Sequence, residues 1–187
     1  KQFNVTTLIC PCDVSKKDQV EIMSKTVLEK FNFIDILVNN AGFAIYGSVL
    51  DLSIEEIESQ METNYFGVLR CTKALLPSMR INRKGCIINI ASVSGHISNS
   101  PLSAYAASKF ALEAVSEALA QEVKPFNIRV AIVEPGIINT QMASNISIND
   151  ESIYPHSKRL AGLFSASLKT PTQPTLVAEK ILEISES

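Results

Sequence analysis

Residues 34–42 read IDILVNNAG, and this stretch decides the fold class of the chain. The apolar residues of segment 34–38 predict a strand in the centre of a parallel sheet, where both faces are covered. The four residues that follow combine two side-chain amides with an alanine and a glycine, which lets a ligand approach their backbone closely. An ordinary polar loop is the alternative at residues 39–42.

Short β-branched runs alternate with helical patterns on both sides of this stretch. Such alternation is typical of βαβ units and predicts an α/β protein built on a parallel sheet. Ser15 is a plausible N-cap, Ser53 and Glu56 have the spacing of a capping box, and Pro125 stops a third helix. The predicted strands are residues 5–10, 34–38, 86–91 and 128–133, and the predicted helices are residues 15–31, 53–79, 103–124 and 175–184.

Each predicted strand is followed by a polar or turn-forming residue. Asp13 comes after the first strand and Asn39 begins the run after the second. Ser92 follows the third strand and Pro135 the fourth. Open parallel sheets bind ligands outside the carboxyl ends of their strands. We therefore expect these residues to meet at one rim of the sheet.

The composition argues against several classes of protein. The chain has 187 residues, of which 46% are hydrophobic, enough for the core of a single domain. The formal charge is −2 and the basic residues are scattered, so nucleic acid is not an expected partner. No apolar stretch approaches the ~18–20 residues that span a bilayer, and no signal peptide is recognisable. We expect a soluble, cytoplasmic protein.

The four cysteines do not favour a metal site. Cys10 and Cys12 are separated by one proline, which differs from the Cys-x-x-Cys spacing, and no second cluster of Cys or His completes a zinc site. With Cys71 and Cys86 dispersed elsewhere, we expect free buried thiols in a reducing compartment.

Tyr105 and Lys109 are the strongest candidates for catalysis. They lie four residues apart in an alanine-rich, helical stretch, and such residues share one face of a helix. A tyrosine with the ordinary pKa of ~10 is rarely ionised at neutral pH, but a nearby ammonium lowers the pKa and makes the phenol an acid-base catalyst. Ser92 lies thirteen residues before the tyrosine. A half-buried ring beside a solvated amine is the alternative.

A long segment without a strong pattern covers residues 139–170. Segments of this kind are usually functional, so we interpret it as a substrate-covering lid with short helices of its own. Its apolar residues favour a lipid-like or steroid-like substrate. They are Ile153, Tyr154, Leu160, Leu163 and Phe164.

The two histidines raise a hydrolase alternative. A nucleophile elbow requires Gly-x-Ser-x-Gly on a strand-to-helix turn, and the chain contains no such sequence. We therefore interpret His96 and His156 as solvated or lid residues.

Taken together, these motifs resemble the short-chain dehydrogenase/reductase family, in order and in spacing, over the whole chain. The resemblance implies a Rossmann-like, doubly wound parallel sheet in three α/β/α layers and a single domain spanning residues 1–187. It also implies an NAD(P)(H)-dependent oxidoreductase that interconverts a secondary alcohol and a ketone, without metal. The motifs are Asp13-Val14, Asn39-Asn40-Ala41-Gly42, Asn64, Ser92, Tyr105 with Lys109, and the run from Pro135 to Thr140.

The resemblance assigns four residues to catalysis. Ser92 would hydrogen-bond the substrate oxygen, and Tyr105 would exchange a proton with it. Lys109 would lower the tyrosine pKa and bind the nicotinamide ribose. Asn64, in a helical pattern where asparagine has mediocre propensity, would perturb the helix and hold a water for proton relay. A surface asparagine is the alternative for Asn64.

The resemblance also assigns cofactor contacts, with NAD or NADP as the cofactor. Asp13 and Val14 would flank the adenine, while Asn39 and the backbone of Ala41 and Gly42 would contact the adenosine half. The remaining contacts, around the nicotinamide, would come from Tyr105, Lys109, Pro135, Gly136, Ile138 and Thr140.

One part of the family pattern is missing from the sequence, namely the Gly-rich phosphate loop Thr-Gly-x-x-x-Gly-x-Gly. The resemblance places about fifty further residues, including that loop and the residue that selects NAD or NADP, before residue 1. Two absent strands would leave segment 5–10 roughly 14 Å from segment 34–38, so we expect the chain to be part of a longer protein.

Two further expectations rest on the same resemblance. A homodimer or homotetramer would form through helices 53–79 and 103–124. A non-catalytic regulator or assembly subunit that binds a dinucleotide on the same scaffold is the alternative to an enzyme.

Overall fold

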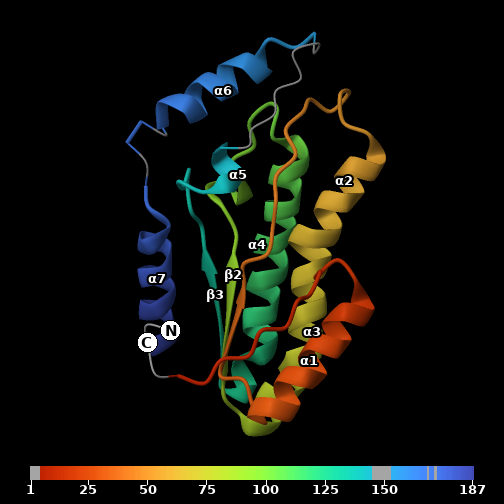
Figure 1. Ribbon diagram of the computed structural model, residues 1–187, viewed down its shortest axis with the longest axis vertical. Helices are drawn as coiled ribbons and strands as arrows, with labels where there is room; N and C mark the ends of the chain where they lie inside the picture. Colours follow the sequence, from red (N-terminus) through yellow and green to blue (C-terminus); the bar gives the residue numbers. More distant parts are fainter. Residues whose placement is uncertain (1–4, 145–152, 168, 171) are drawn as a thin grey trace.

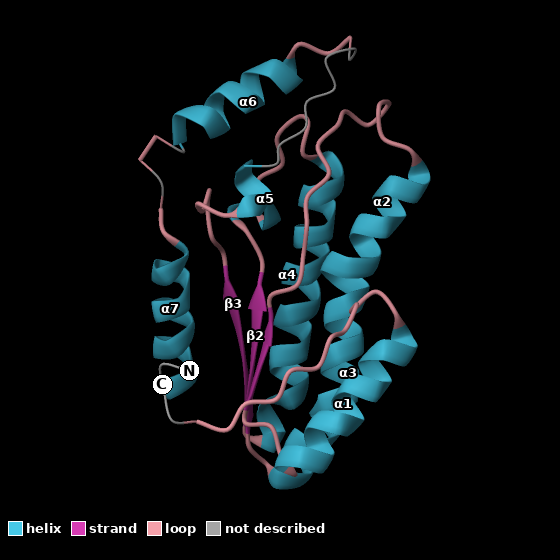
Figure 2. Ribbon diagram, in the orientation of Figure 1, coloured by secondary structure: helices cyan, strands magenta, loops and turns pink. Residues whose placement is uncertain are grey.

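A parallel sheet forms the centre of the computed structural model, which describes residues 5–144, 153–167, 169–170 and 172–187 (Figures 1 and 2). In this part of the chain the strand order is β1 (Ile36–Asn39), β2 (Gly85–Ile90) and β3 (Ile128–Val133), and both pairings are parallel. The predicted strand 128–133 is confirmed to the residue, and the predicted strand 86–91 is shifted by one residue.

Helices cover both faces of this sheet (Figure 1). α3 (Val68–Asn82) and α4 (Ser103–Val123) lie on one face, with α1 (Lys17–Phe31) packed against α3. α7 (Pro174–Glu186) lies on the other face. The three-layer α/β/α arrangement predicted for the chain is therefore confirmed.

The two faces of β2 explain how these layers are held together. Ile87 is fully buried and packs with Met79 of α3 and Val123 of α4. Its neighbours Cys86 and Ile88 point to the other face, where they contact apolar side chains of α7. Because successive side chains of a strand alternate in direction, a continuously apolar strand buries both of its faces.

A chain of buried polar side chains connects the sheet to α4. The Asn39 side-chain amide donates to Asn89 Oδ1 at 2.8 Å, and the Asn89 amide donates to Ser116 Oγ at 2.8 Å. Ser116 in turn donates to the Leu112 carbonyl at 2.6 Å. These hydrogen bonds join β1, β2 and α4, and the burial of all four residues makes each bond costly to break.

Residues 5–10 do not form the predicted strand. Val5 and Ile9 are 67% and 89% exposed, and this segment pairs with no strand of the described chain. A strand is stable only when a neighbour satisfies its backbone groups, and β1 is an edge strand that does not reach this segment. The prediction was wrong because β-branched composition does not provide a pairing partner.

The strand predicted at residues 34–38 also differs from expectation. It is β1, it begins two residues later, and it is the edge of the sheet in the described chain rather than a strand covered on both faces. Ile36 and Val38 are 40% and 37% exposed, whereas Leu37 and Asn39 face α3 and the interior. The face of β1 that carries Ile36 and Val38 is exposed, because no described helix or strand packs against it.

The helix predicted at residues 53–79 is interrupted. It consists of α2 (Ile54–Met61), a π-helical segment η1 (Glu62–Gly67), and α3, which continues past Pro77 to Asn82. A π-helix fits an extra residue into a turn, so a period of 3.6 residues does not reveal it. Such segments occur frequently at functional sites.

Of the two helix N-caps predicted from the sequence, one is confirmed and one is wrong. The capping box at the start of α2 is confirmed, because Ser53 Oγ accepts from the Glu56 backbone and the Glu56 carboxylate accepts from the Ser53 backbone. Ser15 is not the N-cap of α1. That position is taken by Lys16, because residues 13–16 close a backbone turn first, with Lys16 N donating to the Asp13 carbonyl.

The segment predicted as a lid, residues 139–170, contains the predicted short helices. They are α5 (Gln141–Ser144) and α6 (His156–Ser167), and His156 begins the second of them. Residues 145–152 and 168 of that prediction lie outside the described residues. Figure 1 shows α6 above the carboxyl ends of the strands, and Leu160 and Phe164 of this helix belong to one apolar cluster with Tyr105.

The capping box gives a testable stability prediction. Ser53→Ala removes the hydrogen bond to the Glu56 backbone, so the free energy of unfolding should fall by about 1 kcal/mol in urea titrations. Ser59→Ala, at an exposed position of the same helix, is the control and should cause no loss. Equal stability of the two variants would show that the box does not stabilise α2.

Candidate active site

Ser92 lies directly after β2, at the carboxyl edge of the sheet. It is buried and caps the short 3₁₀ segment η2 (Val93–Gly95), because its Oγ accepts from Ser94 N at 3.1 Å. The same hydroxyl donates to the Pro135 carbonyl at 3.4 Å, which ties the end of β2 to the residues after β3. The Ser92 hydroxyl also lies near enough to the Tyr105 phenol to lower the pKa of the tyrosine. The serine and tyrosine predicted to act together are therefore brought together.

Tyr105 is a buried residue of the first turn of α4. Burial raises the pKa of Tyr105 above its ordinary value, and the nearby Ser92 hydroxyl acts in the opposite direction without cancelling the rise. The expectation that Lys109 lowers the pKa of Tyr105 is not met in this structure. Desolvation of the ring outweighs the favourable contacts of a phenolate.

Lys109 lies one turn further along α4, and its ammonium is buried. Its Nζ donates to the Ile90 carbonyl at 2.8 Å and lies 5.7 Å from the centroid of the Tyr105 ring. Burial lowers the pKa of Lys109 to about 8, and the Glu113 carboxylate opposes this shift. The pKa of this lysine is thus near physiological pH and well below the pKa of an exposed lysine.

Asn64 is buried inside the π-helical segment η1, so the surface alternative for this residue is wrong. Its Oδ1 accepts from Phe43 N at 3.0 Å, and its Nδ2 donates to the Phe43 carbonyl at 2.9 Å and to Ser108 Oγ at 3.1 Å. Ser108 donates to the Tyr105 carbonyl at 2.7 Å. Asn64 therefore joins the loop after β1 to the helix turn that carries Tyr105. The water-holding role stays a prediction.

Gly42 brings that loop close to the catalytic residues. A Cβ atom at this position would lie 3.2 Å from Asn64 Oδ1 and 3.9 Å from Lys109 Nζ. A side chain here would press on the asparagine and occupy the space beside the ammonium. The glycine keeps this close approach free of steric pressure on Asn64.

A cavity of about 570 Å³ opens at this edge of the sheet and is lined in part by α6. Ser92, Tyr105 and Lys109 line it, so three of the four predicted catalytic residues face one space. Of the predicted cofactor residues, five others also line it, namely Gly42, Pro135, Gly136, Ile138 and Thr140. The residues that do not line it are Asp13, Val14, Asn39, Ala41 and Asn64.

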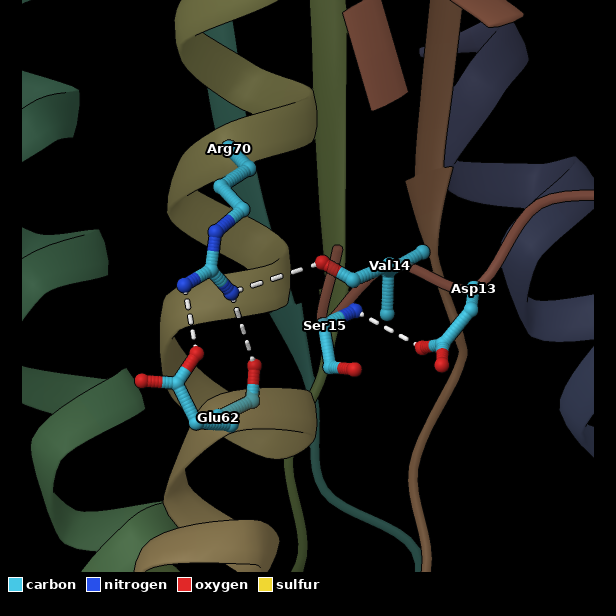
Figure 3. Close-up of polar contacts among 5 residues, drawn as sticks. All are labelled: Asp13, Val14, Ser15, Glu62 and Arg70. Atoms are coloured by element: carbon cyan, nitrogen blue, oxygen red, sulfur yellow. Dashed lines mark hydrogen bonds and ion pairs between the residues drawn. The ribbon is translucent and has the colours of Figure 1, made fainter. Parts of the chain in front are cut away.

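Val14 is held against the π-helical segment instead, and Asp13 hydrogen-bonds within its own segment (Figure 3). The Arg70 guanidinium donates to the Val14 carbonyl at 3.4 Å and to the Glu62 carbonyl at 3.1 Å, and it forms an ion pair with the Glu62 carboxylate. Asp13 Oδ1 accepts from the backbone of Ser15 at 2.9 Å, and its hydrogen bonds with Ser15 hold the pKa of Asp13 below its usual range. Their adenine contacts stay a prediction.

Several residues of this region were not found from the sequence. Phe43 and Ser108 act through the Asn64 hydrogen bonds, and no local pattern marks them. Gln60 is fully buried and accepts from the Ile45 backbone at 2.7 Å, and its helical position two residues after a glutamate carries no signal. Tyr46 lines the cavity and packs edge-on against Phe164, and burial raises the pKa of Tyr46 to about 12.

No helix in the described part of the chain is long and apolar enough to cross a membrane. This finding concerns residues 5–144, 153–167, 169–170 and 172–187.

Comparison with known proteins identifies relatives along most of the chain. The dehydrogenase/reductase SDR family member 7B of Xenopus laevis is 38% identical over 170 residues, which are 91% of this chain and 50% of that protein. The 3-ketodihydrosphingosine reductase of Bacteroides thetaiotaomicron is 41% identical over 157 residues, 84% of this chain and 58% of that protein. The chain thus spans about half the length of these curated relatives.

A solved structure and a family model agree with these relatives. The structure of a short-chain dehydrogenase from Streptomyces avermitilis is similar with a TM-score of 0.67 and 42% identity, over 70% of this chain and 48% of that chain. The family model described as short chain dehydrogenase matches residues 1–151. The chain therefore belongs to the short-chain dehydrogenase family.

Proposed function

We propose that the protein is an NAD(P)(H)-dependent oxidoreductase that interconverts a secondary alcohol and a ketone at Ser92, Tyr105 and Lys109. One observation carries this proposal. A buried tyrosine, one helical turn from a buried lysine, lines a cavity of about 570 Å³ together with Ser92 at the carboxyl ends of parallel strands. Two hydroxyls and an ammonium suit a substrate oxygen and a nucleotide ribose.

The lining of the cavity fits the nicotinamide half of a dinucleotide. Gly42 leaves space beside the ammonium of Lys109, and a Cβ at Gly136 would meet no atom within 4 Å, so the backbone at both glycines is accessible. Lys109 would hold the ribose, and Ile138 and Thr140 would hold the carboxamide. When bound, the nicotinamide supplies or accepts the hydride.

The proton chemistry follows from the environment of the tyrosine. In reduction, the Tyr105 O–H bond breaks and its proton goes to the substrate oxygen, which becomes the alcohol hydroxyl. Ser92 orients that oxygen and stabilises its developing charge with a hydrogen bond. Burial raises the pKa of Tyr105, so the phenol retains its proton at neutral pH. Lys109 places a positive charge beside the phenolate that remains, and Asn64 holds the helix turn in place.

The apolar walls of the cavity support a lipid-like alcohol or ketone as the substrate. The walls above the catalytic residues come from Leu160, Leu163 and Phe164 of α6, with Ile181 of α7 opposite. One relative bears the name 3-ketodihydrosphingosine reductase, which describes reduction of a long-chain ketone. Burial of a hydrocarbon chain would contribute ~0.8 kcal/mol per methylene.

Self-association and a cytoplasmic location are also proposals. Phe66 in η1 and Phe110 in α4 are exposed apolar residues on the two predicted interface helices, 53–79 and 103–124, which supports association through that face. Sedimentation analysis that finds only monomers would exclude the proposed dimer and tetramer.

Removal of the tyrosine hydroxyl tests the proton transfer. Tyr105→Phe should lower kcat at least a hundredfold, because general acid-base catalysis contributes about 10²–10⁴. Binding of NADH or NADPH, followed by fluorescence, should be largely retained. Tyr46→Phe is the matched control, since Tyr46 lines the same cavity and has no catalytic role here. A fully active Tyr105→Phe variant would exclude the assignment, and binding without turnover in the unaltered protein would favour the regulator.

The pH dependence tests the lysine. Because burial lowers the pKa of Lys109 to about 8, the ammonium is charged below that pH and neutral above it. The kcat/KM for ketone reduction should therefore be constant at lower pH and fall as the pH rises through about 8. A profile that stays flat up to about pH 10, near the ordinary lysine pKa, would contradict the prediction.

The proposed substrate class is tested at α6. Phe164→Ala removes apolar surface from the cavity, so the KM for a long-chain ketone should rise about tenfold, while the KM for a short ketone should change little. Ser165→Ala, at the next and exposed position, is the control. Equal effects on long and short ketones would show that the cavity does not bind the chain of the substrate.

A further inference from the structure

A buried carboxylate lies one helical turn beyond Lys109 and has no role in the mechanism above. Glu113 belongs to α4 and is 7% exposed, and residues four apart share one face of a helix. Its Oε1 is buried and accepts no hydrogen bond from any described residue. An unpaired buried carboxylate is costly, so the fold must offset its charge by another interaction.

The turn behind Ser92 leaves room for this carboxylate. A Cβ atom at Gly95 would lie 2.9 Å from Glu113 Cγ and 3.0 Å from its Oε1. Gly95 ends the segment η2 that Ser92 caps, so Glu113 packs directly against the catalytic serine's turn. A side chain at position 95 would displace Glu113 from this place.

Charged groups from three elements face Glu113. Lys109 and Glu117 come from α4 itself, His96 follows η2, and Glu134 follows β3. His96 Nε2 and Glu134 Oε1 are 3.0 Å apart and partly exposed, at 54% and 38% of their side chains. One nitrogen or oxygen atom from each of His96, Glu113 and Glu134 lies within 4.8 Å of the others. Glu113 therefore lies between a buried ammonium and an ion pair that reaches solvent.

We propose that Glu113 is a positioning residue that keeps Lys109 in its charged form, and that the His96–Glu134 pair controls the charge of Glu113. The inference rests on the proposed function, in which Lys109 acts as a cation. A buried ammonium and a buried carboxylate on one helix face offset part of each other's desolvation.

The electrostatics around both groups support this arrangement. Burial lowers the pKa of Lys109, and the Glu113 carboxylate raises it. Burial and the Glu134 carboxylate raise the pKa of Glu113, while His96 and Lys109 lower it. Glu134 thus influences Lys109 through the charge of Glu113. The Glu113 carboxylate therefore raises the pKa of Lys109, whereas Glu134 weakens that effect by raising the pKa of Glu113.

The experiment measures the charge of Lys109 without depending on turnover. Acetylation of its Nζ by acetic anhydride, followed by peptide mass spectrometry against pH, gives the midpoint at which the amine loses its proton. Glu113→Gln should lower this midpoint by about one pH unit, because it removes a nearby opposite charge. Glu134→Gln should raise the midpoint, and an unchanged midpoint would show that the pair does not control the charge of Glu113. Glu122→Gln, at an exposed position of the same helix, should have no effect.

Two outcomes would overturn the inference. One is an unchanged midpoint in Glu113→Gln, and the other is an unchanged or lowered midpoint in Glu134→Gln. If Glu113→Gln does not fold, Glu113→Asp replaces it and keeps the negative charge. Glu134→Gln changes a partly exposed residue and still tests whether the midpoint of Lys109 moves upwards. A shifted midpoint in a protein that reduces no ketone would sustain the inference and exclude the proposed function.

Discussion

The structure depends on one buried amide, the side chain of Asn89 in the central strand. Asn89 pairs with Asn39 across the parallel register of β1 and β2, accepts a hydrogen bond from it, and donates to Ser116 of α4. Because a buried amide left unpaired costs about 1–3 kcal/mol, these bonds resist both strand slippage and movement of the helix. Ser92 follows the end of β2 and α4 begins near Tyr105, so the position of the serine relative to the tyrosine depends on this contact.

The π-helical segment provides the second constraint on the site. It places Asn64 where both ends of its amide reach the backbone of Phe43, and the nitrogen also reaches Ser108 behind Tyr105. Val14 packs against the same segment at Gly67, because a Cβ atom at Gly67 would lie only 2.6 Å from Val14 Cγ2. The loop after β1, the start of α1 and the catalytic turn of α4 are thus fixed to one short piece of irregular helix.

Much of this arrangement could be predicted from the sequence, and the failures have physical causes. Residues 128–133 form a strand because they pair with the buried strand β2 and their composition is β-branched. Residues 5–10 have a similar composition but pair with no strand in the described part of the chain. The spacing of Tyr105 and Lys109 predicted that they share one face of the helix. It did not predict their pKa values, because the sequence shows which charged group is near but not how deeply both groups are buried. The roles of Asn89 and Glu113 depend on contacts between distant segments, which no local pattern encodes.

Burial connects the proposed substrate site to the proposed direction of proton transfer. Leu160 and Phe164 line the cavity and belong to the same apolar cluster as Tyr105. Burial raises the pKa of Tyr105, and this cluster is part of what covers the tyrosine. A phenol that retains its proton is a donor, so in the proposed mechanism a covered site favours reduction of a ketone. Oxidation of an alcohol needs the phenolate, whose charge must then be stabilised by Lys109, and the charge of Lys109 is itself limited by the same burial.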